Sequence, residues 1–200
     1  AALAVVATAV RPWPEQGGGR GAQVIAAVEN RTSTAIRLVA TDSSYRLLAG
    51  GQPVLGRFLY ALPNAIDPGE RGYLIDVVDL ASGIRGPSPI LEVALGEGGA
   101  LDRPLERLEV RDVTWTAGSA GLWVRGSVTN TLGSPVLQGV VGAVALDAGD
   151  RPLAGVVDLT ELSPLGPDET RAFDLAEPPT GPIDPATIAR LEVFAFDLEG

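Results

Sequence analysis

The chain has 200 residues, of which 46% are hydrophobic, and a formal net charge of −10. This apolar content is typical of a folded protein, and the acidic charge disfavours nucleic acids and anionic membranes, which need a basic surface on their partner. Cysteine, histidine, lysine and methionine are absent. Their absence excludes disulfides, thiolate or imidazole metal sites, cysteine nucleophiles and Schiff-base chemistry. We therefore expect no enzyme, no catalytic residue, no cofactor and no metal site.

Residues 1–10 are almost wholly apolar, but ten residues are too few to span a bilayer. We interpret them as a strand because residues 3–13 align with residues 105–115, each segment ending in a Trp. Since the sequence does not begin with Met, we expect a secretion signal or membrane anchor to have preceded Ala1. The expected location is extracellular or at the cell envelope, with membrane contact only through that removed anchor.

The first half of the chain predicts a series of short strands separated by turns. Residues 35–41 alternate as a half-buried strand does, with Ile36, Leu38 and Ala40 facing inward. Only residues 61–66 and 185–190 favour a helical turn, because no other segment sustains a 3.6-residue period. The remaining expected strands in this half are residues 3–13, 22–28, 45–48, 54–62, 73–80 and 90–95.

The second half repeats this plan. Residues 122–130 repeat the pattern of residues 23–30 and place Asn130 opposite Asn30. A period of this length indicates a domain duplicated in tandem rather than a solenoid of short repeats. We predict domains at residues 1–96 and 105–200, joined by a linker at residues 97–104. The expected strands of the second domain are residues 105–115, 122–128, 136–146, 153–162, 170–175 and 191–196.

About seven short strands per unit, with turn signals between them, are typical of an immunoglobulin-like or fibronectin-III-like β-sandwich. The cysteine pair of antibody domains is absent. We expect Trp13, Trp115 and Trp123 to fill the cores instead, since a strand Trp is more often buried than exposed. An exposed platform of these side chains for binding sugar is the alternative.

Three motifs of the second unit resemble the bacterial and archaeal FxLYD-type domains and their water-stress (LEA-14-like) relatives. The motifs lie at residues 126–130, 146–153 and 165–173, although Ala143 and Leu146 stand where the signature has Phe and Tyr, and only Asp147 is kept. The resemblance covers the second unit well and the first in outline. It implies Ig-like sandwiches that are exported or tethered to a membrane and mostly have no assigned activity.

Two pairs of polar residues are candidates for a site. Asp147 and Asp150 flank a Gly in a tight turn and could supply oxygens to Ca²⁺, but an Asp in such a turn commonly bonds its own backbone, which we favour. Asn30 begins an N-x-T sequence for glycosylation, whereas Asn130 does not. A turn-capping role explains both asparagines with one cause, and we favour that role.

These features predict a non-catalytic, monomeric tandem module that binds another protein or spaces a partner domain from the cell envelope. A carbohydrate-binding or accessory domain of a hydrolase is the alternative. We expect the two domains to touch through a small, partly polar contact at residues 101–105. We also expect stability to be indifferent to calcium and to pH between 6 and 8.

Overall fold

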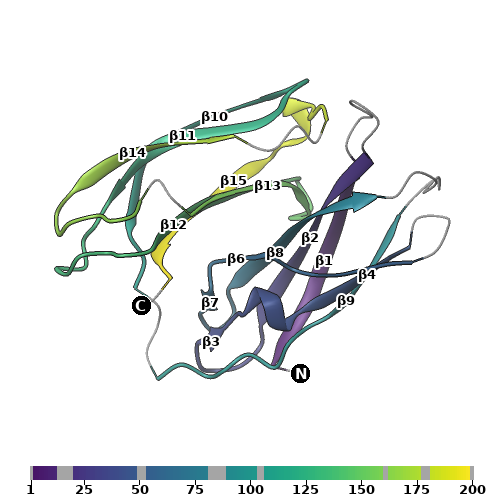
Figure 1. Ribbon diagram of the computed structural model, residues 1–200, viewed down its shortest axis with the longest axis horizontal. Coiled ribbons are helices and arrows are strands. Elements are labelled where there is room, and N and C mark those ends of the chain that lie inside the picture. The colour runs from purple at the N-terminus through teal and green to yellow at the C-terminus, as the bar shows by residue number, and fades with distance from the viewer. Residues whose placement is uncertain are drawn as a thin grey trace.

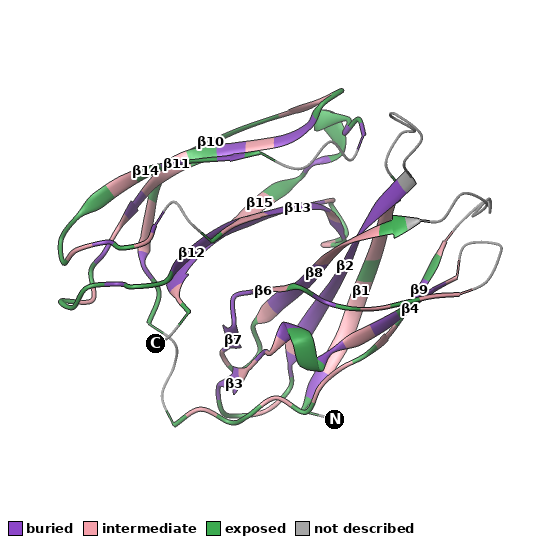
Figure 2. Cartoon of the chain, in the orientation of Figure 1, coloured by how far each residue is buried: buried purple, intermediate pink, exposed green. Residues whose placement is uncertain are grey.

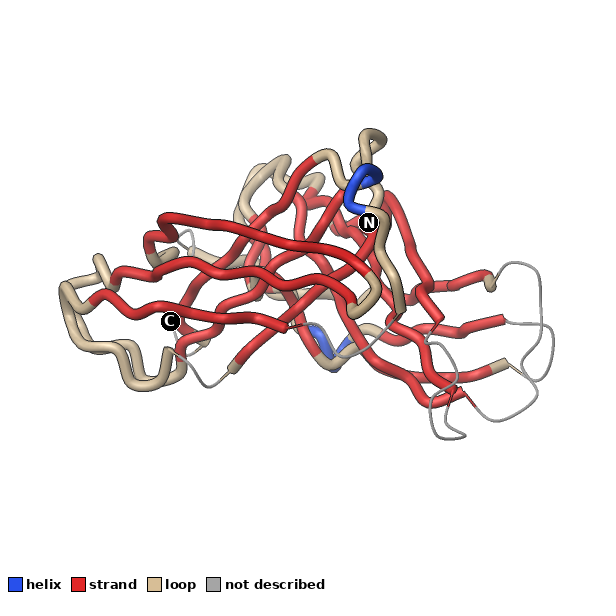
Figure 3. The backbone as a smooth tube through the Cα atoms, turned by 90° about the horizontal axis from the view of Figure 1, so that it is seen from above, coloured by secondary structure: helices blue, strands red, loops and turns tan. Residues whose placement is uncertain are grey.

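The computed structural model describes residues 2–12, 20–48, 53–80, 89–102, 106–159, 162–176 and 181–198. Strands make up most of this chain, and the helical turns are η1 (Ala40–Asp42) and η2 (Pro185–Thr187) (Figure 3). The fold is all-β, with several sheets, as the short alternating segments predict. The helical turn expected at residues 185–190 occurs in shortened form as η2. The one expected at residues 61–66 is wrong, because strands occupy that segment.

Two sheets stack in the N-terminal half, residues 2–102. The inner sheet has the order β1-β2-β8-β6, and the outer sheet the order β5-β4-β9, with a separate short pair of β3 and β7. Ile36, Leu38 and Ala40 are buried as predicted, although only residues 36 and 37 of the expected strand pair with another strand. The strands are β1 (Leu3–Pro12), β2 (Arg20–Asn30), β3 (Ile36–Arg37), β4 (Ser44–Leu48), β5 (Val54–Arg57), β6 (Tyr60–Leu62), β7 (Ala65–Ile66), β8 (Arg71–Leu80) and β9 (Ile90–Ala94).

Two further sheets form the C-terminal half, residues 106–198. The order β10-β11-β14 in its outer sheet corresponds to β1-β2-β8, and the order β13-β12-β15 in its inner sheet corresponds to β5-β4-β9. The four sheets lie one above another (Figure 1). The strands are β10 (Glu109–Gly118), β11 (Gly121–Thr129), β12 (Gly139–Leu146), β13 (Pro152–Asp158), β14 (Thr170–Ala176) and β15 (Arg190–Asp197).

Every residue of β12 is buried, because β12 is covered on both faces. Val141, Ala143 and Ala145 belong to the core of the C-terminal half. The alternate residues Val140 and Val144 belong instead to a cluster shared with the N-terminal half. A strand buried on both faces needs a continuous apolar run rather than an alternating one, which explains the sequence of β12. Figure 2 shows the buried positions gathered along β2, β8 and β12.

The shared cluster is a hydrophobic core between the two inner sheets. A Cβ atom added to Gly142 would lie 2.6 Å from Leu62 Cδ1, too close for any side chain. A Cβ atom added to Gly155 would likewise lie 2.6 Å from Ile75 Cδ1. The two glycines thus leave space into which the N-terminal half packs. The buried members of the shared core are Ile25, Ala27, Leu62, Tyr73, Ile75, Val140, Val144, Leu146, Phe194 and Phe196.

Gln23 adds a buried polar contact between the halves. Its side-chain Nε2 donates to the carbonyl oxygen of Gly155 at 2.7 Å, and its Oε1 accepts from the N–H of Gly155 at 2.9 Å. β13 is an edge strand, so its outward backbone groups have no neighbouring strand to bond. The amide of Gln23 therefore takes the place of a strand partner at this edge.

The small polar contact expected at the linker differs from what the structure shows. The contact is partly polar, as expected, but it lies between the two inner sheets and not at residues 101–105. Residues 99–101 pack along the N-terminal half: Arg37 N–H bonds to Gly99 O at 2.8 Å and Leu101 N–H to Ala35 O at 2.8 Å. Leu105 lies outside the described residues. Three of residues 96–99 are glycine, yet backbone hydrogen bonds and a bridge from Ala100 to Ile36 fix residues 99–101 against β3.

Candidate functional site

Asp147 caps the turn between β12 and β13. Its Oδ1 accepts hydrogen bonds from the N–H groups of Gly149 (2.8 Å) and Arg151 (3.0 Å), and its Oδ2 accepts one from Arg151 Nε (2.8 Å). These bonds, those from Arg151 foremost, hold the pKa of Asp147 below its usual range. The turn-capping prediction is confirmed. Asp150, at φ 60°, directs its carboxylate to Arg190 at 3.1 Å instead of sharing a site with Asp147.

Asn30 and Asn130 have the same local role in the two halves. The Nδ2 of Asn30 donates to Thr34 O and Ile66 O, both at 2.8 Å, while its Oδ1 accepts from the N–H of Thr32 at 2.9 Å. Asn130 makes the matching bonds with Ser134, Leu165 and Leu132. Both side chains are fully buried. The turn-capping interpretation is confirmed for both, and a buried Asn30 amide leaves no room for a glycan.

Trp115 and Trp123 do not fill a core as predicted. Trp115 lies on the edge strand β10 and is 37% exposed, and Trp123 on β11 is half-buried. Trp13 lies outside the described residues. Strand register shows why the alignment misleads: Trp115 pairs with Val124, whereas the residue that pairs with Val24 is Val10. Val5 likewise pairs with Val28 and Val110 with Val128, so β10 is offset from β1 by 105 residues (110 − 5), whereas the alignment used 102 (105 − 3).

Trp115 and Trp123 instead line a shallow pocket on the surface of the C-terminal half, together with Thr114, Thr116 and Arg125. Arg125 pairs with Asp174 on the neighbouring strand at 2.9 Å. This small surface combines aromatic side chains with polar groups.

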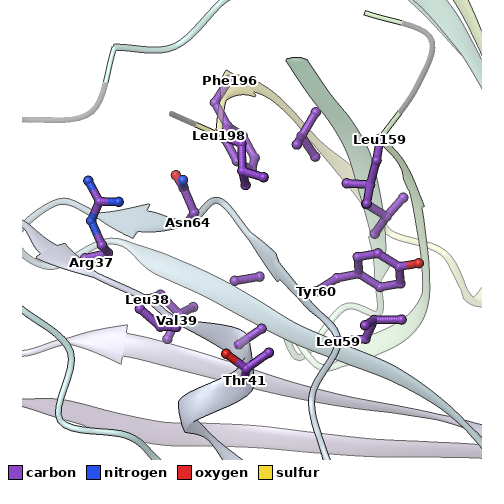
Figure 4. A pocket seen from close by; sticks show the side chains of 14 residues that line it. Arg37, Leu38, Val39, Thr41, Leu59, Tyr60, Asn64, Leu159, Phe196 and Leu198 are labelled. Carbon is purple, nitrogen blue, oxygen red and sulfur yellow. The ribbon is translucent and has the colours of Figure 1, made fainter. Parts of the chain in front are cut away.

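A larger, mostly apolar cleft opens where the two halves meet, at the C-terminal end of β15 (Figure 4). Its volume is about 370 Å³. The N-terminal half contributes η1, β6 and the segments beside them, and the C-terminal half contributes β12, β13 and β15. The residues lining it are Arg37, Leu38, Val39, Ala40, Thr41, Leu59, Tyr60, Ala61, Asn64, Val140, Val157, Leu159, Phe196 and Leu198.

Asn64 is the buried polar residue in the wall of this cleft. Its side chain is only 8% exposed, and its Oδ1 is buried without a hydrogen-bond donor. The backbone of Asn64 is used, since its carbonyl oxygen accepts from Leu38 N–H at 2.7 Å. A buried acceptor without a donor is costly and uncommon, so this atom marks the most unusual point of the cleft.

At the opposite end of β15, charged side chains bridge the halves. Arg190 contacts Asp150 (3.1 Å) and Glu192 (2.8 Å), and Arg71 on β8 reaches Asp150 at 3.6 Å. Tyr73, also on β8, donates a hydrogen bond to Glu192 Oε2 at 2.8 Å. Burial raises the pKa of the Tyr73 hydroxyl, and the hydrogen bond to Glu192 raises that pKa further. This end of the interface is therefore fixed by polar contacts.

Within the part of the chain that the structure describes, no three carboxylates gather as a metal site would require. Among those same residues no helix is long and apolar enough to cross a membrane. The cleft's described polar side chains are those of Arg37, Thr41, Tyr60 and Asn64.

Sequence reasoning missed the cleft, Asn64 and the Tyr73–Glu192 contact. The unbroken apolar run of β12 and its Gly142 are the signals that could have pointed to a second covered face. No signal marks Asn64, whose surroundings come from both halves. Compared with known proteins, the chain matches no protein-family model, and no curated protein matches it.

Proposed function

We propose that the chain is a non-catalytic, exported or envelope-tethered module of two Ig-like sandwiches in tandem, of the FxLYD and water-stress type, which binds another protein or spaces a neighbouring domain. The correspondence of strand order between the halves supports the tandem arrangement. The matching hydrogen bonds of Asn30 and Asn130 support it too. The exported location follows from the resemblance.

The observation that carries the spacing role is the shared core. A spacer must keep its two ends in a fixed relation, and independent domains on a flexible linker do not do this. Here ten buried apolar residues and the Gln23–Gly155 pair join the inner sheets. We therefore infer that the two halves form one rigid unit and do not move independently.

Distances between spin labels test this stiffness. The chain has no cysteine, so labels attach only where Cys is introduced. We choose Leu55→Cys on β5 and Val113→Cys on β10, both exposed positions on opposite outer sheets. The pair Leu55→Cys and Ile90→Cys, within one outer sheet, serves as the control for label motion. We expect equally narrow distance distributions; a much broader distribution for the pair between halves would contradict the spacer.

Carbohydrate binding is the second candidate, favoured by the Trp115–Trp123 pocket. Sugars stack on aromatic faces, and Arg125 and the threonines beside them can bond hydroxyl groups. A glycan array with the intact chain checks this candidate, with Trp123→Ala as the site variant and Leu55→Ala as the control on the other half. A sugar retained by the control and lost by Trp123→Ala would favour the second candidate over the first.

A further inference from the structure

The cleft between the halves has the dimensions and surface of a small-molecule site. Its volume of about 370 Å³ lies within the usual range of ligand pockets, roughly 300–1,000 Å³. A dry apolar cavity of about 150 Å³ accepts benzene, so this space accommodates about two fused rings. Such sites occur preferentially where two domains meet and are lined by hydrophobic and aromatic side chains.

Exposed leucines gather at this cleft. Leu59, Leu159 and Leu198 are 57%, 46% and 41% exposed, and all three line it, from both halves of the chain. Folding alone does not require a leucine to remain in water beside an open apolar space. A molecule seated in the cleft would cover these side chains and gain the free energy of their burial.

Asn64 places one polar requirement on a ligand of this cleft. Its Oδ1 is a buried acceptor without a donor, and its side chain points from β6–β7 toward the end of β15 that carries Phe196 and Leu198 (Figure 4). A donor brought by a ligand would satisfy this atom, at the small cost of turning the amide toward the open space. A purely apolar molecule supplies no such donor. Asn64 therefore favours, among ligands of equal shape, the one that carries a hydrogen-bond donor.

We propose that the cleft binds a small, uncharged, largely apolar molecule of about two-ring size that donates one hydrogen bond to Asn64 Oδ1. A cation is disfavoured by the apolar walls and by the positive charge of Arg37. The four polar side chains among the described lining do not include a carboxylate, so nothing there would pair with an ammonium group. This inference goes beyond the spacing function and does not depend on it.

Two probes of nearly equal shape test the hydrogen bond. 2-Naphthol carries a hydroxyl donor and is uncharged at neutral pH, whereas 2-methoxynaphthalene lacks the donor. Calorimetric titration into the intact chain should show saturable binding of both, with 2-naphthol about tenfold tighter, as one satisfied buried acceptor predicts. In Asn64→Leu the two probes should bind with equal affinity, because the acceptor is gone and the apolar walls remain.

Methyl NMR of the unmodified chain locates the bound probe without relying on the folding of a variant. The methyl signals of Leu59, Leu159 and Leu198 should shift on adding 2-naphthol. Those of Leu55 and Leu137, which are exposed but do not line the cleft, are the internal control and should stay. Shifts confined to the three cleft leucines support the proposal.

Four results would each overturn it. These are no saturable binding of either probe, equal affinities in the unmodified chain, shifts at Leu55 or Leu137 in place of the cleft leucines, and tighter binding of the anion 2-naphthoate than of 2-naphthol. None of them bears on the spin-label distances, so this proposal and the spacer can fail separately.

Discussion

The two ends of β15 show how one interface can be charged at one end and apolar at the other. At the N-terminal end, the contacts Arg71–Asp150 and Tyr73–Glu192 join the halves beside a pocket of about 460 Å³ with mostly charged walls. At the C-terminal end, Phe196 and Leu198 face a cleft of about 370 Å³. Both ends lie on the same pair of sheets and both leave space, so sheet packing alone does not decide which side chains line that space.

The difference follows from the length and polarity of the side chains at each end. Arg and Glu side chains are long and flexible enough to span the space between twisted sheets, and their charged ends find partners there. Leu side chains are shorter and have no partner to bond across a gap. A stable module with a ligand site needs both ends: the polar end and the central core hold the halves, and the apolar end remains free to bind.

Breaking the centre of the shared core should have the largest effect. In Val144→Asp a carboxylate enters the cluster between the halves without a cationic partner. We expect a loss of at least about 4 kcal/mol in the free energy of unfolding, measured by urea denaturation, because a buried unpaired charge is strongly destabilising. Val113→Asp on exposed β10 is the matched control and should cost less than ~0.5 kcal/mol. Equal losses in the two variants would show that the shared core contributes little.

Removing the amide of Gln23 should have the next largest effect. Gln23→Leu leaves the N–H and the carbonyl oxygen of Gly155 buried without their present partner. The expected loss is ~2–6 kcal/mol, about 1–3 kcal/mol for each of the two orphaned groups. Leu55→Ala, at an exposed position on β5, is the control and should change stability by less than ~0.5 kcal/mol. A neutral Gln23→Leu would mean that the pair fixes register without adding stability.

The tyrosines compare a bond between the halves with one inside a half. Tyr73 donates to Glu192, and Tyr45 donates to Asp76 at 2.6 Å. Tyr73→Phe and Tyr45→Phe should each cost ~1 kcal/mol at pH 7 in urea denaturation. Only Tyr73→Phe should also broaden the spin-label distances between the halves. Broadening in both variants, or in neither, would remove the distinction between the two bonds.

The same tyrosines predict a dependence on alkaline pH. Burial, with the hydrogen bonds to Glu192 and Asp76, raises the pKa of both hydroxyls above that of a free tyrosine, near 10. The unfolded chain therefore loses these protons first. Stability from this source is complete below pH ~10 and falls as pH rises beyond it. The urea midpoint should be flat from pH 6 to 8 and drop above pH 10, less steeply in Tyr73→Phe; an unchanged slope in that variant would contradict the assignment.

The smallest effect is expected at the exposed ion pairs of Arg107. This side chain bonds Glu70 across the halves and lies 3.9 Å from Asp67. Arg107→Ala should cost no more than ~1 kcal/mol, and the loss should shrink in high salt, because solvent and counterions screen exposed pairs. Arg46→Ala, which breaks an exposed pair with Glu92 inside one sheet, is the control. A much larger, salt-independent loss for Arg107 would give this pair a structural role.

Local chemistry predicted a good part of the structure. Period-2 alternation identified the β class and the inward positions of Ile36 and Leu38. Turn chemistry identified the roles of Asn30, Asn130 and Asp147, since each side chain bonds backbone within a few residues of itself. These predictions succeeded because both ends of the interaction lie close together in the chain.

The tertiary structure decided what the sequence left open. The unbroken apolar run of β12 signals a second covered face but not what covers it, and nothing in β10 itself predicts the exposure of Trp115. The Tyr73–Glu192 bond and the walls around Asn64 join residues from opposite halves. Their positions depend on how two twisted sheets meet, a property of the packed surfaces together that no single segment of the chain contains.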